Sequence, residues 1–249
     1  MNQTIKILSS HRSIRKFRNR PVEKELFDTI VRAAQCASSS NNIQAYTVIN
    51  ITDRKVRKQI AQLAGPQPWV DHAPVFMVFC ADLTRLDAAC EYHGYTPEQG
   101  WTEQLIVAVT DTAIFAQNLV IAAESAGLGA VFIGGIRNNP DMVCELLKIP
   151  DHAWPVFGMC LGWPDQNPGT KPRLPLELVL RQDTFKGKIT EEKASELMHD
   201  YDRAMQAYYE KRNPDLAGQT WRSQMADFMC CAARPHMKSF LEKKGFMLK

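Results

Sequence analysis

The chain has 249 residues, of which 45% are hydrophobic, and its 30 basic and 27 acidic side chains leave a formal net charge of only +3. This apolar content is enough to bury a substantial core and argues against disorder as the dominant state. The nearly balanced charge provides no global electrostatic surface for nucleic acid, so any recognition of anions must be local.

The N-terminal region and the apolar runs indicate a cytoplasmic protein. The sequence MNQTIKILSSHRS lacks the long apolar region and the cleavage site of a secretory signal. We also expect no stretch to approach the ~20 apolar residues that a membrane span needs. The cysteines form no CxxC pair and lie mostly in apolar segments, which predicts reduced core residues rather than disulfides or metal ligands. There are seven: Cys36, Cys80, Cys90, Cys144, Cys160, Cys230 and Cys231.

The first motif in the chain is HRSIRKF, residues 11–17. His11, Arg12, Ser13 and Arg15 can aim an imidazole, two guanidinium groups and a hydroxyl at one phosphate, with main-chain N–H groups as further donors. The alternative is a solvated basic surface, which is the commoner role of a short basic run.

Helices and strands alternate after this motif. Apolar residues at helical spacing predict a helix over 21–37, and an Asp53 cap with a Gly65 stop predicts a second helix over 53–65. Short β-branched or aromatic runs bounded by proline or glycine predict strands over 45–52, 74–82, 129–135 and 155–163.

Two polar loops lie between these elements. CASSSNN, residues 36–42, follows the first helix with hydroxyl and amide groups, although it is also compatible with a simple polar turn. FIGGIRNN, residues 132–139, ends a strand in Gly134 and Gly135, where backbone N–H groups can approach a flat ligand with no Cβ in the way. The alternative there is a tight turn before an Asn139 cap and Pro140.

The longest helix is predicted to begin at Thr96, with Pro97 in the first position and Gln99 completing a capping box, and to end at Gly127. Between residues 105 and 123 it is apolar on nearly every face, which predicts burial all round. A second subunit and a monomeric core are equally compatible with that burial.

The C-terminal part differs in character. In KPRLP, Lys171 and Arg173 flank Pro172, which helps to hold both cations in an extended loop. A strand is predicted over 176–185, followed by a helix from a Thr190 cap to Arg212. We interpret residues 1–249 as a single domain in which 174–249 form a C-terminal excursion and extension.

The remaining motifs exclude several chemistries. The sequence holds no GxGxxG after a strand, no GxxxxGK[ST] and no GxSxG, and its six histidines show no HExxH or paired ligand spacing, so no metal site is predicted. This lack of a catalytic side-chain set favours chemistry carried by a bound cofactor. Cations for a phosphate, a glycine turn for a flat group and a hydroxyl-rich loop describe a nucleotide-like cofactor.

Five segments, in this order along nearly the whole chain, resemble those of FMN-dependent nitroreductases. They are HRSIRKF, ASSSNN, the GPQ turn at 65–67, AAESAGLGAVFIGGIRNN and FGMCLGWPDQNPGTKPRLP. The resemblance is to the oxygen-insensitive NADPH nitroreductase and flavin reductase branch. It implies a nitroreductase-like α+β fold with a central, mostly antiparallel sheet flanked by helices, and an intertwined homodimer with a C-terminal excursion. FMN would lie at each of two subunit interfaces, to which the long helix would contribute much of the contact.

The resemblance also implies the residues of the site. The FMN phosphate would be held by charged or polar side chains, with Arg12 supporting their loop: His11, Ser13, Lys171 and Arg173. Arg15 would reach the pyrimidine edge of the flavin, where a cation favours the negative charge that accumulates on reduction. Ribityl or ring atoms would be contacted by Ser39, Gln67 and the N–H groups of Ile133, Gly134 and Gly135. NADPH or substrate would be contacted by Ser40, Asn41, Arg212 and Arg234.

The implied activity is a ping-pong NAD(P)H oxidoreductase reaction, with NADPH as donor and NADH possible. The flavin N5 would be the reactive centre, no side chain is assigned as catalytic, and the acceptors would be nitroaromatics, quinones or free flavins. Two positions depart from the pattern. Arg212 has no second arginine before Arg222 to share a 2′-phosphate, although Arg234 could compensate or could end a helix before Pro235. Asn41 and Asn42 make the pocket rim more polar than in similar sequences.

Two other functions are compatible with these residues. A non-catalytic FMN-binding sensor or flavin carrier would bind the same cofactor without turnover. The cationic loops could instead dock a phosphorylated or nucleic-acid partner, but the balanced charge argues against this, and we predict no nucleic-acid partner and no membrane association.

Overall fold

The computed structural model describes residues 1–249, apart from the side chain of Pro214. Its internal contacts divide the chain into two compact units. The first comprises Met1–Asn167 together with Arg234–Lys249, and the second comprises Pro168–Ala233. The single-domain organisation with an excursion from residue 174 stays a prediction.

The first unit is built on a four-stranded sheet in which every neighbouring pair of strands is antiparallel, in the order β1-β2-β4-β3. The strands are β1 (Tyr46–Asn50), β2 (Val75–Asp82), β3 (Gly129–Ile133) and β4 (Ala153–Gly162). All four predicted strands of this region are thereby confirmed, as is the antiparallel sheet. The register between β2 and β4 shifts after Phe79, next to Pro155, which brings no N–H group to the ladder.

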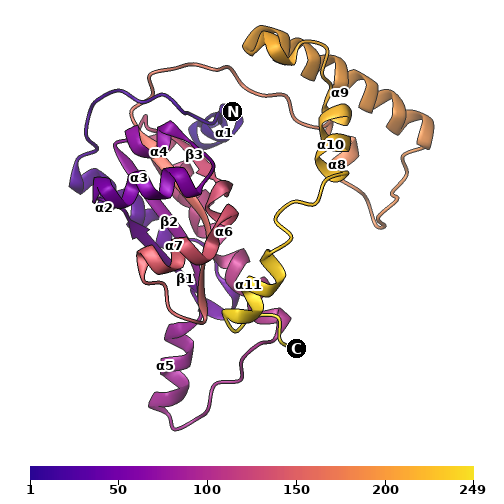
Figure 1. Cartoon of the computed structure of the whole chain (residues 1–249). Coiled ribbons are helices and arrows are strands. Elements are labelled where there is room, and N and C mark those ends of the chain that lie inside the picture. The colour runs from indigo at the N-terminus through magenta and orange to yellow at the C-terminus, as the bar shows by residue number, and fades with distance from the viewer. The chain divides into compact units, whose positions relative to one another are not determined.

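Helices cover both faces of this sheet (Figure 1). Along β2, Met77 and Phe79 face a cluster that includes α2 (Lys24–Gln35) and α6 (Thr102–Ser125). The alternate residues Phe76 and Val78 face a cluster that includes α3 (Arg54–Leu63), α4 (Pro68–His72), α7 (Pro140–Leu147) and α11 (Met237–Lys243). Because both faces are covered, every residue of β2 is buried, which explains its uninterrupted apolar sequence.

Local signals placed several helices correctly. The helix predicted over 21–37 is α2, and the one predicted over 53–65 is α3, where Asp53 accepts hydrogen bonds from the N–H groups of Lys55 and Val56. Four helices of the first unit were not anticipated from the sequence: α1 (Gln3–Ser9), α4, α5 (Thr84–Tyr92) and α11. α5 and the chain that follows it project from one end of the sheet (Figure 1).

The predicted start of the longest helix at Thr96 is wrong, because α6 begins at Thr102. Gly100 has a φ of +89°, which breaks any helix through it, and its carbonyl accepts hydrogen bonds of 2.8 and 2.9 Å from the N–H groups of Leu248 and Lys249. The side chain of Gln104 instead caps the helix by accepting from the Trp101 N–H at 3.2 Å. The C-terminal residues therefore bond to the backbone just before the start of α6.

Burial of α6 on every side is also not observed within one chain. Ile106 is 54% exposed and Ile114 38% exposed, and with Thr110, Ala113 and Gln117 they form an exposed stripe at helical spacing. The sequence was expected to hold no stretch long and apolar enough to cross a membrane, but α6 is such a helix by length and composition. A core helix of a soluble protein can meet the same criteria. Its opposite side packs on the sheet, with Phe115 stacked on Tyr46 at 4.4 Å between ring centroids.

The second unit contains α8 (Leu176–Val179), α9 (Glu191–Arg212), η3 (Pro214–Leu216) and α10 (Trp221–Met229). The strand predicted over 176–185 is wrong, since α8 and a turn occupy this segment and no strand lies in the described part of the unit to pair with it. The Thr190 cap of α9 is confirmed by a hydrogen bond from the Lys193 N–H. Tyr201, Met205 and Tyr209 on α9 form a small buried cluster of this unit.

A charged pair joins α9 to α10. Arg222 Nε donates to Asp202 Oδ2, and the Arg222 N–H donates to Asp202 Oδ1 at 3.1 Å. Burial by itself would raise the pKa of Asp202, but the hydrogen bonds from Arg222 outweigh it and hold that pKa below its usual value.

The cysteines are only partly as predicted. Cys80, Cys144 and Cys160 are buried and free, and burial raises the pKa of each, that of Cys144 to about 11. The prediction of core positions is wrong for three others, which are exposed at the ends of helices: Cys36, Cys230 and Cys231. Among the described residues, no group of three or more potential metal ligands is found.

Candidate functional site

The HRSIRKF segment runs beside β3 and the end of β4. The Ile14 N–H donates to the Ala130 carbonyl at 2.9 Å, and the Arg18 N–H donates to the Trp163 carbonyl at 2.9 Å. The side chain of Ile14 is 2% exposed and takes the space at Gly129, where an added Cβ would lie 2.5 Å from it. With Ile14 buried, the neighbouring Ser13 and Arg15 remain half-buried at the surface of the unit.

The start of the segment is held by a carboxylate from the long helix. His11 Nδ1 lies 2.7 Å from Oε1 of Glu124, 113 positions later in the chain. The Arg12 guanidinium donates to the carbonyl of Ser10 at 3.2 Å and so braces the same turn. An imidazole held through Nδ1 presents its Nε2 away from the carboxylate, which suits it to an external ligand.

Arg15, Gln67 and Gly135 are brought into one corner of the first unit. The Arg15 guanidinium lies 5.9 Å from the ring centroid of Trp69, whose Nε1 donates to Gln67 Oε1 at 3.1 Å. Gln67 Nε2 donates in turn to the Ala64 carbonyl at 2.9 Å. We name Arg15, Trp69, Gln67 and Gly135 the glycine corner.

Gly135 has no room for a side chain. A Cβ placed there would lie 2.0 Å from the Ala64 carbonyl oxygen and 2.7 Å from Gln67 Nε2. The neighbouring Gly134 is different, since the nearest atom to its Cβ would be Arg137 Nη2 at 3.6 Å. The close approach at Gly135 packs the turn η2 (Gly134–Asn138) on the GPQ turn and leaves the backbone after Ile133 next to polar side chains.

The serine and asparagine loop is held by a buried carboxylate. Asp111 on α6 is 1% exposed and accepts from the Ser40 N–H at 3.0 Å and the Ala45 N–H at 3.2 Å. Between these two points the backbone is left-handed at Asn41, Asn42 and Gln44. Asparagine tolerates that conformation better than most residues, so the two asparagines have a backbone role in addition to their polarity.

The consecutive residues Ser39 and Ser40 have different contacts. Ser39 Oγ accepts from the Gln44 N–H at 3.3 Å, which closes the loop on itself. Ser40 and Asn41 line a cavity of about 340 Å³ that is also bounded by Asp87 on α5, by Glu98 before α6 and by His152 before β4. A cavity of this size can hold a small organic molecule.

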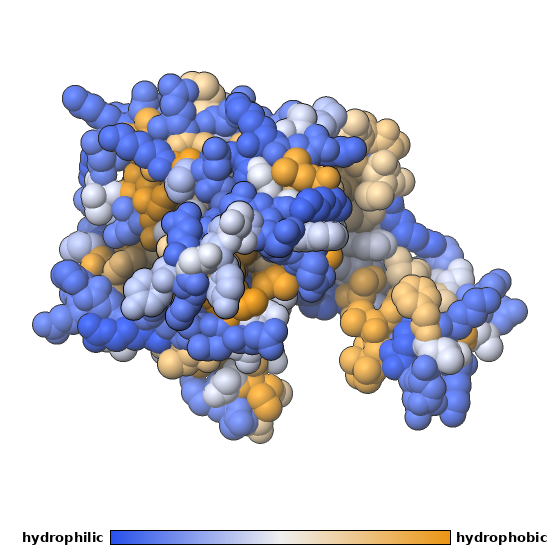
Figure 2. All heavy atoms as spheres, turned by 90° about the horizontal axis from the view of Figure 1, so that it is seen from below, coloured by the Kyte–Doolittle hydropathy of each residue, from blue (hydrophilic) through white to orange (hydrophobic). Residues whose placement is uncertain are grey.

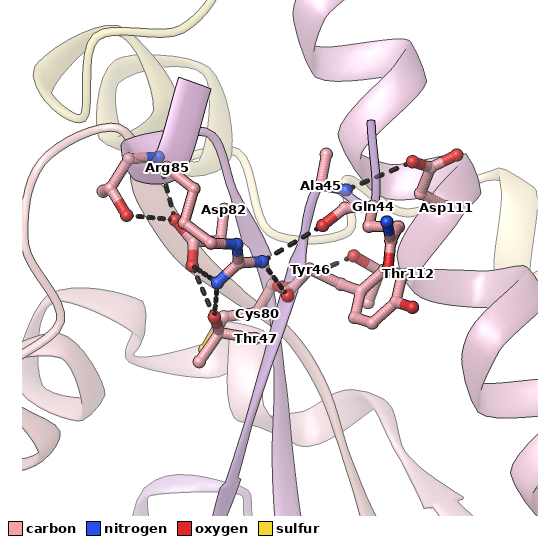
Figure 3. A network of polar contacts seen from close by, with 10 residues as sticks. Gln44, Ala45, Tyr46, Thr47, Cys80, Asp82, Arg85, Asp111 and Thr112 are labelled. Atoms are coloured by element: carbon pink, nitrogen blue, oxygen red, sulfur yellow. Dashed lines mark hydrogen bonds and ion pairs between the residues drawn. The ribbon is translucent and has the colours of Figure 1, made fainter. Parts of the chain in front are cut away.

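Arg85 on α5 secures the far end of the loop (Figure 3). Its guanidinium donates to the carbonyls of Gln44 and Tyr46 and to Thr47 Oγ1, and it also contacts Asp82 Oδ2 at 3.3 Å. Burial alone would raise the pKa of Asp82, but hydrogen bonds from Thr47 and Thr84 and the charge of Arg85 lower it below its usual value. The loop is therefore tied to Asp111 on α6 and to Arg85 on α5.

The remaining predicted site residues divide between the units. Arg234, in the first unit, has a φ of +54° and donates from Nε to Asn138 Oδ1 at 2.9 Å, so it adjoins η2 and does not end a helix. Lys171 and Arg173 lie in the second unit, where the Lys171 Nζ is 5.3 Å from the Tyr209 ring centroid and Arg173 donates to the Lys171 carbonyl at 2.9 Å. Arg212, also in the second unit, donates to the Tyr208 hydroxyl.

Sequence reasoning missed three residues that position this site: Glu124, Trp69 and Asp111. Asp111 interrupts an apolar helix, and a lone carboxylate in such a place signals a buried hydrogen-bonding role. No comparable local signal marked Glu124 or Trp69, because their partners are known only once the chain is folded.

Comparison with known proteins covers the whole chain. A model described as "Nitroreductase family" matches residues 8–163, and one described as "Nitroreductase family, C-terminal domain" matches residues 171–249. The chain is 42% identical over 246 residues to an oxygen-insensitive NADPH nitroreductase of Salmonella typhimurium, with 99% of each chain covered. It is 39% identical over 248 residues to an FMN reductase (NADPH) of Bacillus subtilis, again with 99% of each covered. The solved structure of nitroreductase A from Vibrio parahaemolyticus superposes with a TM-score of 0.91 at 39% identity, covering 100% of both chains.

Gly135→Ala is expected to disrupt the glycine corner, whereas Gly134→Ala is expected to be tolerated. The first substitution forces a backbone carbonyl to move and should cost about 1–3 kcal/mol or more of unfolding free energy. The second meets only the end of a flexible arginine side chain at ordinary contact distance. Chemical denaturation of both variants, with hydrogen exchange at residues 64–67, checks this. Equal stability of the two variants would contradict the close packing.

Asp82→Asn is expected to lower the free energy of unfolding by about 1.5–3 kcal/mol at neutral pH, because a buried ionised acceptor is lost. The pKa of Asp82 is lower in the folded protein than its ordinary value of about 4. Its contribution to the free energy of unfolding is therefore fully present above pH of about 4 and is lost as the pH falls through the folded pKa. The difference in unfolding free energy between wild type and Asp82→Asn should therefore become smaller below pH of about 4.

Urea denaturation of both proteins at a series of pH values measures that difference. Asp200→Asn is the control, since Asp200 is half-exposed in an ion pair on α9 and should change stability little at any pH. A difference for Asp82→Asn that persists unchanged in acid would mean that ionisation of this carboxyl is not the cause.

Proposed function

Because this chain belongs to the nitroreductase family, we propose that it is an FMN-dependent NAD(P)H oxidoreductase that reduces nitroaromatics, quinones or free flavins by two-electron transfer. The observation in the structure that supports this most is the glycine corner. It gathers a cation, an amide side chain and a side-chain-free stretch of backbone, although the three come from distant parts of the sequence.

The residues present suit FMN. A flavin is flat and has a polar edge of carbonyl and N–H groups, which a guanidinium, a carboxamide and backbone N–H groups can match. Gln67 donates one N–H of its amide to the Ala64 carbonyl. Because a primary amide has two N–H groups, the second can donate to a ligand. When bound, FMN supplies the chemistry that the side chains lack, the uptake of hydride at N5 and its transfer to an acceptor.

In this proposal each polar group has a separate task. Arg15 holds a positive charge beside the pyrimidine edge of the ring, where negative charge accumulates on reduction. Gln67 and Ser39 contact ring or ribityl atoms, and the backbone of residues 133–135 faces the polar edge. The phosphate would be held by the charged or polar side chains that the sequence assigns to it: His11, Ser13, Lys171 and Arg173. Glu124 and Arg12 position the first of these segments.

Substrates are assigned to the outer part of the site. Ser40 and Asn41 border the cavity of about 340 Å³, where NADPH or an acceptor would contact them. Arg212 and Arg234 are proposed to contact NADPH. If Arg212 is the one arginine that binds the 2′-phosphate, NADH can serve as a second electron donor. We place the enzyme in the cytoplasm, with small molecules rather than nucleic acid or membranes as its partners.

We further propose that the enzyme is a homodimer in which the exposed stripe of α6 contacts a second copy. Isoleucines that stand 54% and 38% exposed on a core helix leave apolar surface that association would bury. Figure 2 shows how hydrophilic residues dominate the visible face of the molecule and hydrophobic residues gather in a few places between them. A stripe of this kind on α6 is therefore a feature of the surface that a partner would explain.

The central test is anaerobic reduction of the purified, FMN-loaded protein. The yellow colour should bleach on addition of NADPH and return with a quinone or nitrofuran. Arg15→Ala should keep its FMN and bleach roughly tenfold more slowly, because the cation near the pyrimidine edge is gone. Arg32→Ala, an exposed change on α2, is the matched control. FMN that binds without turnover would identify a sensor or carrier, and an unchanged rate for Arg15→Ala would exclude its proposed role.

Ile114→Asp is expected to weaken the dimer by at least about 100-fold, since it would bury an unpaired charge in an apolar contact. Tyr92→Asp on α5 is the control, because Tyr92 is 86% exposed and lies off this stripe. Sedimentation at several protein concentrations gives the dissociation constants. A wild-type protein that is monomeric at micromolar concentration would contradict the proposal.

Arg212→Ala is expected to raise the KM for NADPH about tenfold or more and to leave that for NADH nearly unchanged, because only NADPH carries the 2′-phosphate. Arg203→Ala, on the same helix α9, controls for loss of charge alone. Steady-state kinetics with one quinone acceptor measures both constants, and an equal rise for both donors would show that Arg212 does not read this phosphate.

A further inference from the structure

A second cationic site lies in the first unit, apart from every residue assigned to FMN. It is a cavity of about 810 Å³ between the chain after Phe17, the end of β1, the start of α3 and the segment before β2. Five cationic side chains line this cavity and only one carboxylate, Asp71, does so. We name the five cations the basic basin: Arg18, Arg20, Lys24, Arg54 and Arg57.

The near wall of the basin is held rigidly by Trp163. The Arg20 guanidinium lies 4.0 Å from the centroid of the Trp163 ring, and Trp163 Nε1 donates to the Pro21 carbonyl at 3.1 Å. Arg18 Nε donates to the Pro164 carbonyl at 3.0 Å. These contacts fix two guanidinium groups at one side of the cavity, which reduces the entropy that a ligand must overcome to order them.

Arg57 forms the floor and is the least expected of the five. It is only 8% exposed, and its guanidinium donates to the carbonyls of Ala73 at 2.6 Å and Ile51 at 2.9 Å. Its Nε is buried with no hydrogen-bond partner in the described part of the chain, and the same is true of Oδ1 of Asp71. Both carbonyl partners are neutral, so the buried positive charge of Arg57 is not neutralised by the groups that bond it.

The other cations are only partly balanced. Arg20 pairs with Glu23 at 3.3 Å and Lys24 pairs with Asp28 at 2.5 Å, both at exposed positions where an ion pair contributes little. Arg54 is exposed at the start of α3. The cavity therefore has an excess of positive charge in a chain whose formal net charge is only +3.

We propose that the basic basin binds a small polyanion with a pyrophosphate group, at a site separate from that of FMN. Guanidinium groups match pairs of phosphate oxygens in a forked geometry, and several of them around one cavity suit a group with more than two negative charges. The volume lies within the range of about 300–1,000 Å³ typical of small-molecule pockets. Phe17 and Phe27 also line the cavity and offer apolar surface to a base, if the pyrophosphate belongs to a nucleotide.

The test is calorimetric titration of full-length, FMN-loaded protein with inorganic pyrophosphate. Wild type is expected to bind one equivalent, and Arg54→Ala to bind about tenfold more weakly, since one charge-assisted contact is lost. Arg32→Ala is the matched control, an exposed arginine on α2 that does not line the cavity, and should bind like wild type. The double variant Lys24→Ala/Arg54→Ala should lose most of the remaining affinity.

Further measurements separate this site from the catalytic one. Arg54→Ala should keep the wild-type FMN content and rate of quinone reduction, so failure of the proposed enzyme activity and failure of the basin can be told apart. ADP binding as tightly as pyrophosphate would mean that the pyrophosphate alone is recognised, and tighter binding of ADP would identify a nucleotide. Absence of binding at millimolar pyrophosphate, or equal losses in Arg54→Ala and Arg32→Ala, would overturn the proposal.

Discussion

The candidate site depends on the close approach of two turns, one at the end of β3 and one before α4. Gly135 allows it, because any side chain there would collide with the Ala64 carbonyl at 2.0 Å. The approach places Gln67 against the glycine turn and Trp69 beside it, and Trp69 in turn faces the Arg15 guanidinium. A flat ligand can be recognised by its edge only if these donors stand in one place, and the missing Cβ at Gly135 is what lets the two turns approach.

A second constraint is the use of carboxylates to hold loops that have no regular hydrogen bonding of their own. Asp111 receives two backbone N–H groups of the serine and asparagine loop, and Glu124 receives the imidazole of His11. Both carboxylates come from α6, so one helix positions two segments of the site while its Phe115 packs on the sheet. Burial of Asp111 is tolerable because its two oxygens each accept a hydrogen bond.

Charge in this protein is organised locally. The net charge of +3 conceals clusters of cations, one along residues 11–15 and one in the basic basin. Burial first and then the charge of Arg234 lower the pKa of Arg137. Each cluster is confined to a turn or a cavity, which suits small anionic ligands.

Features that depend on short stretches of chain were predictable from the sequence. The Asp53 and Thr190 caps need only a side chain and the N–H groups two or three residues later, and both are present. Strand β2 was found because its apolar run is uninterrupted, as burial on two faces demands. The motifs HRSIRKF, ASSSNN and FIGG also indicated the family, which the full-length comparisons confirmed.

Features that depend on a distant partner were not predictable. Thr96 carries a good capping signal, yet α6 starts at Thr102, and residues from the C-terminus bond to Gly100 just before it. Residues 176–185 have the composition of a strand, but a strand needs a neighbour to satisfy its backbone groups, and the described second unit offers none. The sequence by itself determined the local elements and the chemical groups available for an anionic, flat cofactor. Only the tertiary structure decided which of them meet, because pairs such as His11 and Glu124 or Arg15 and Trp69 interact across many residues that no local pattern connects.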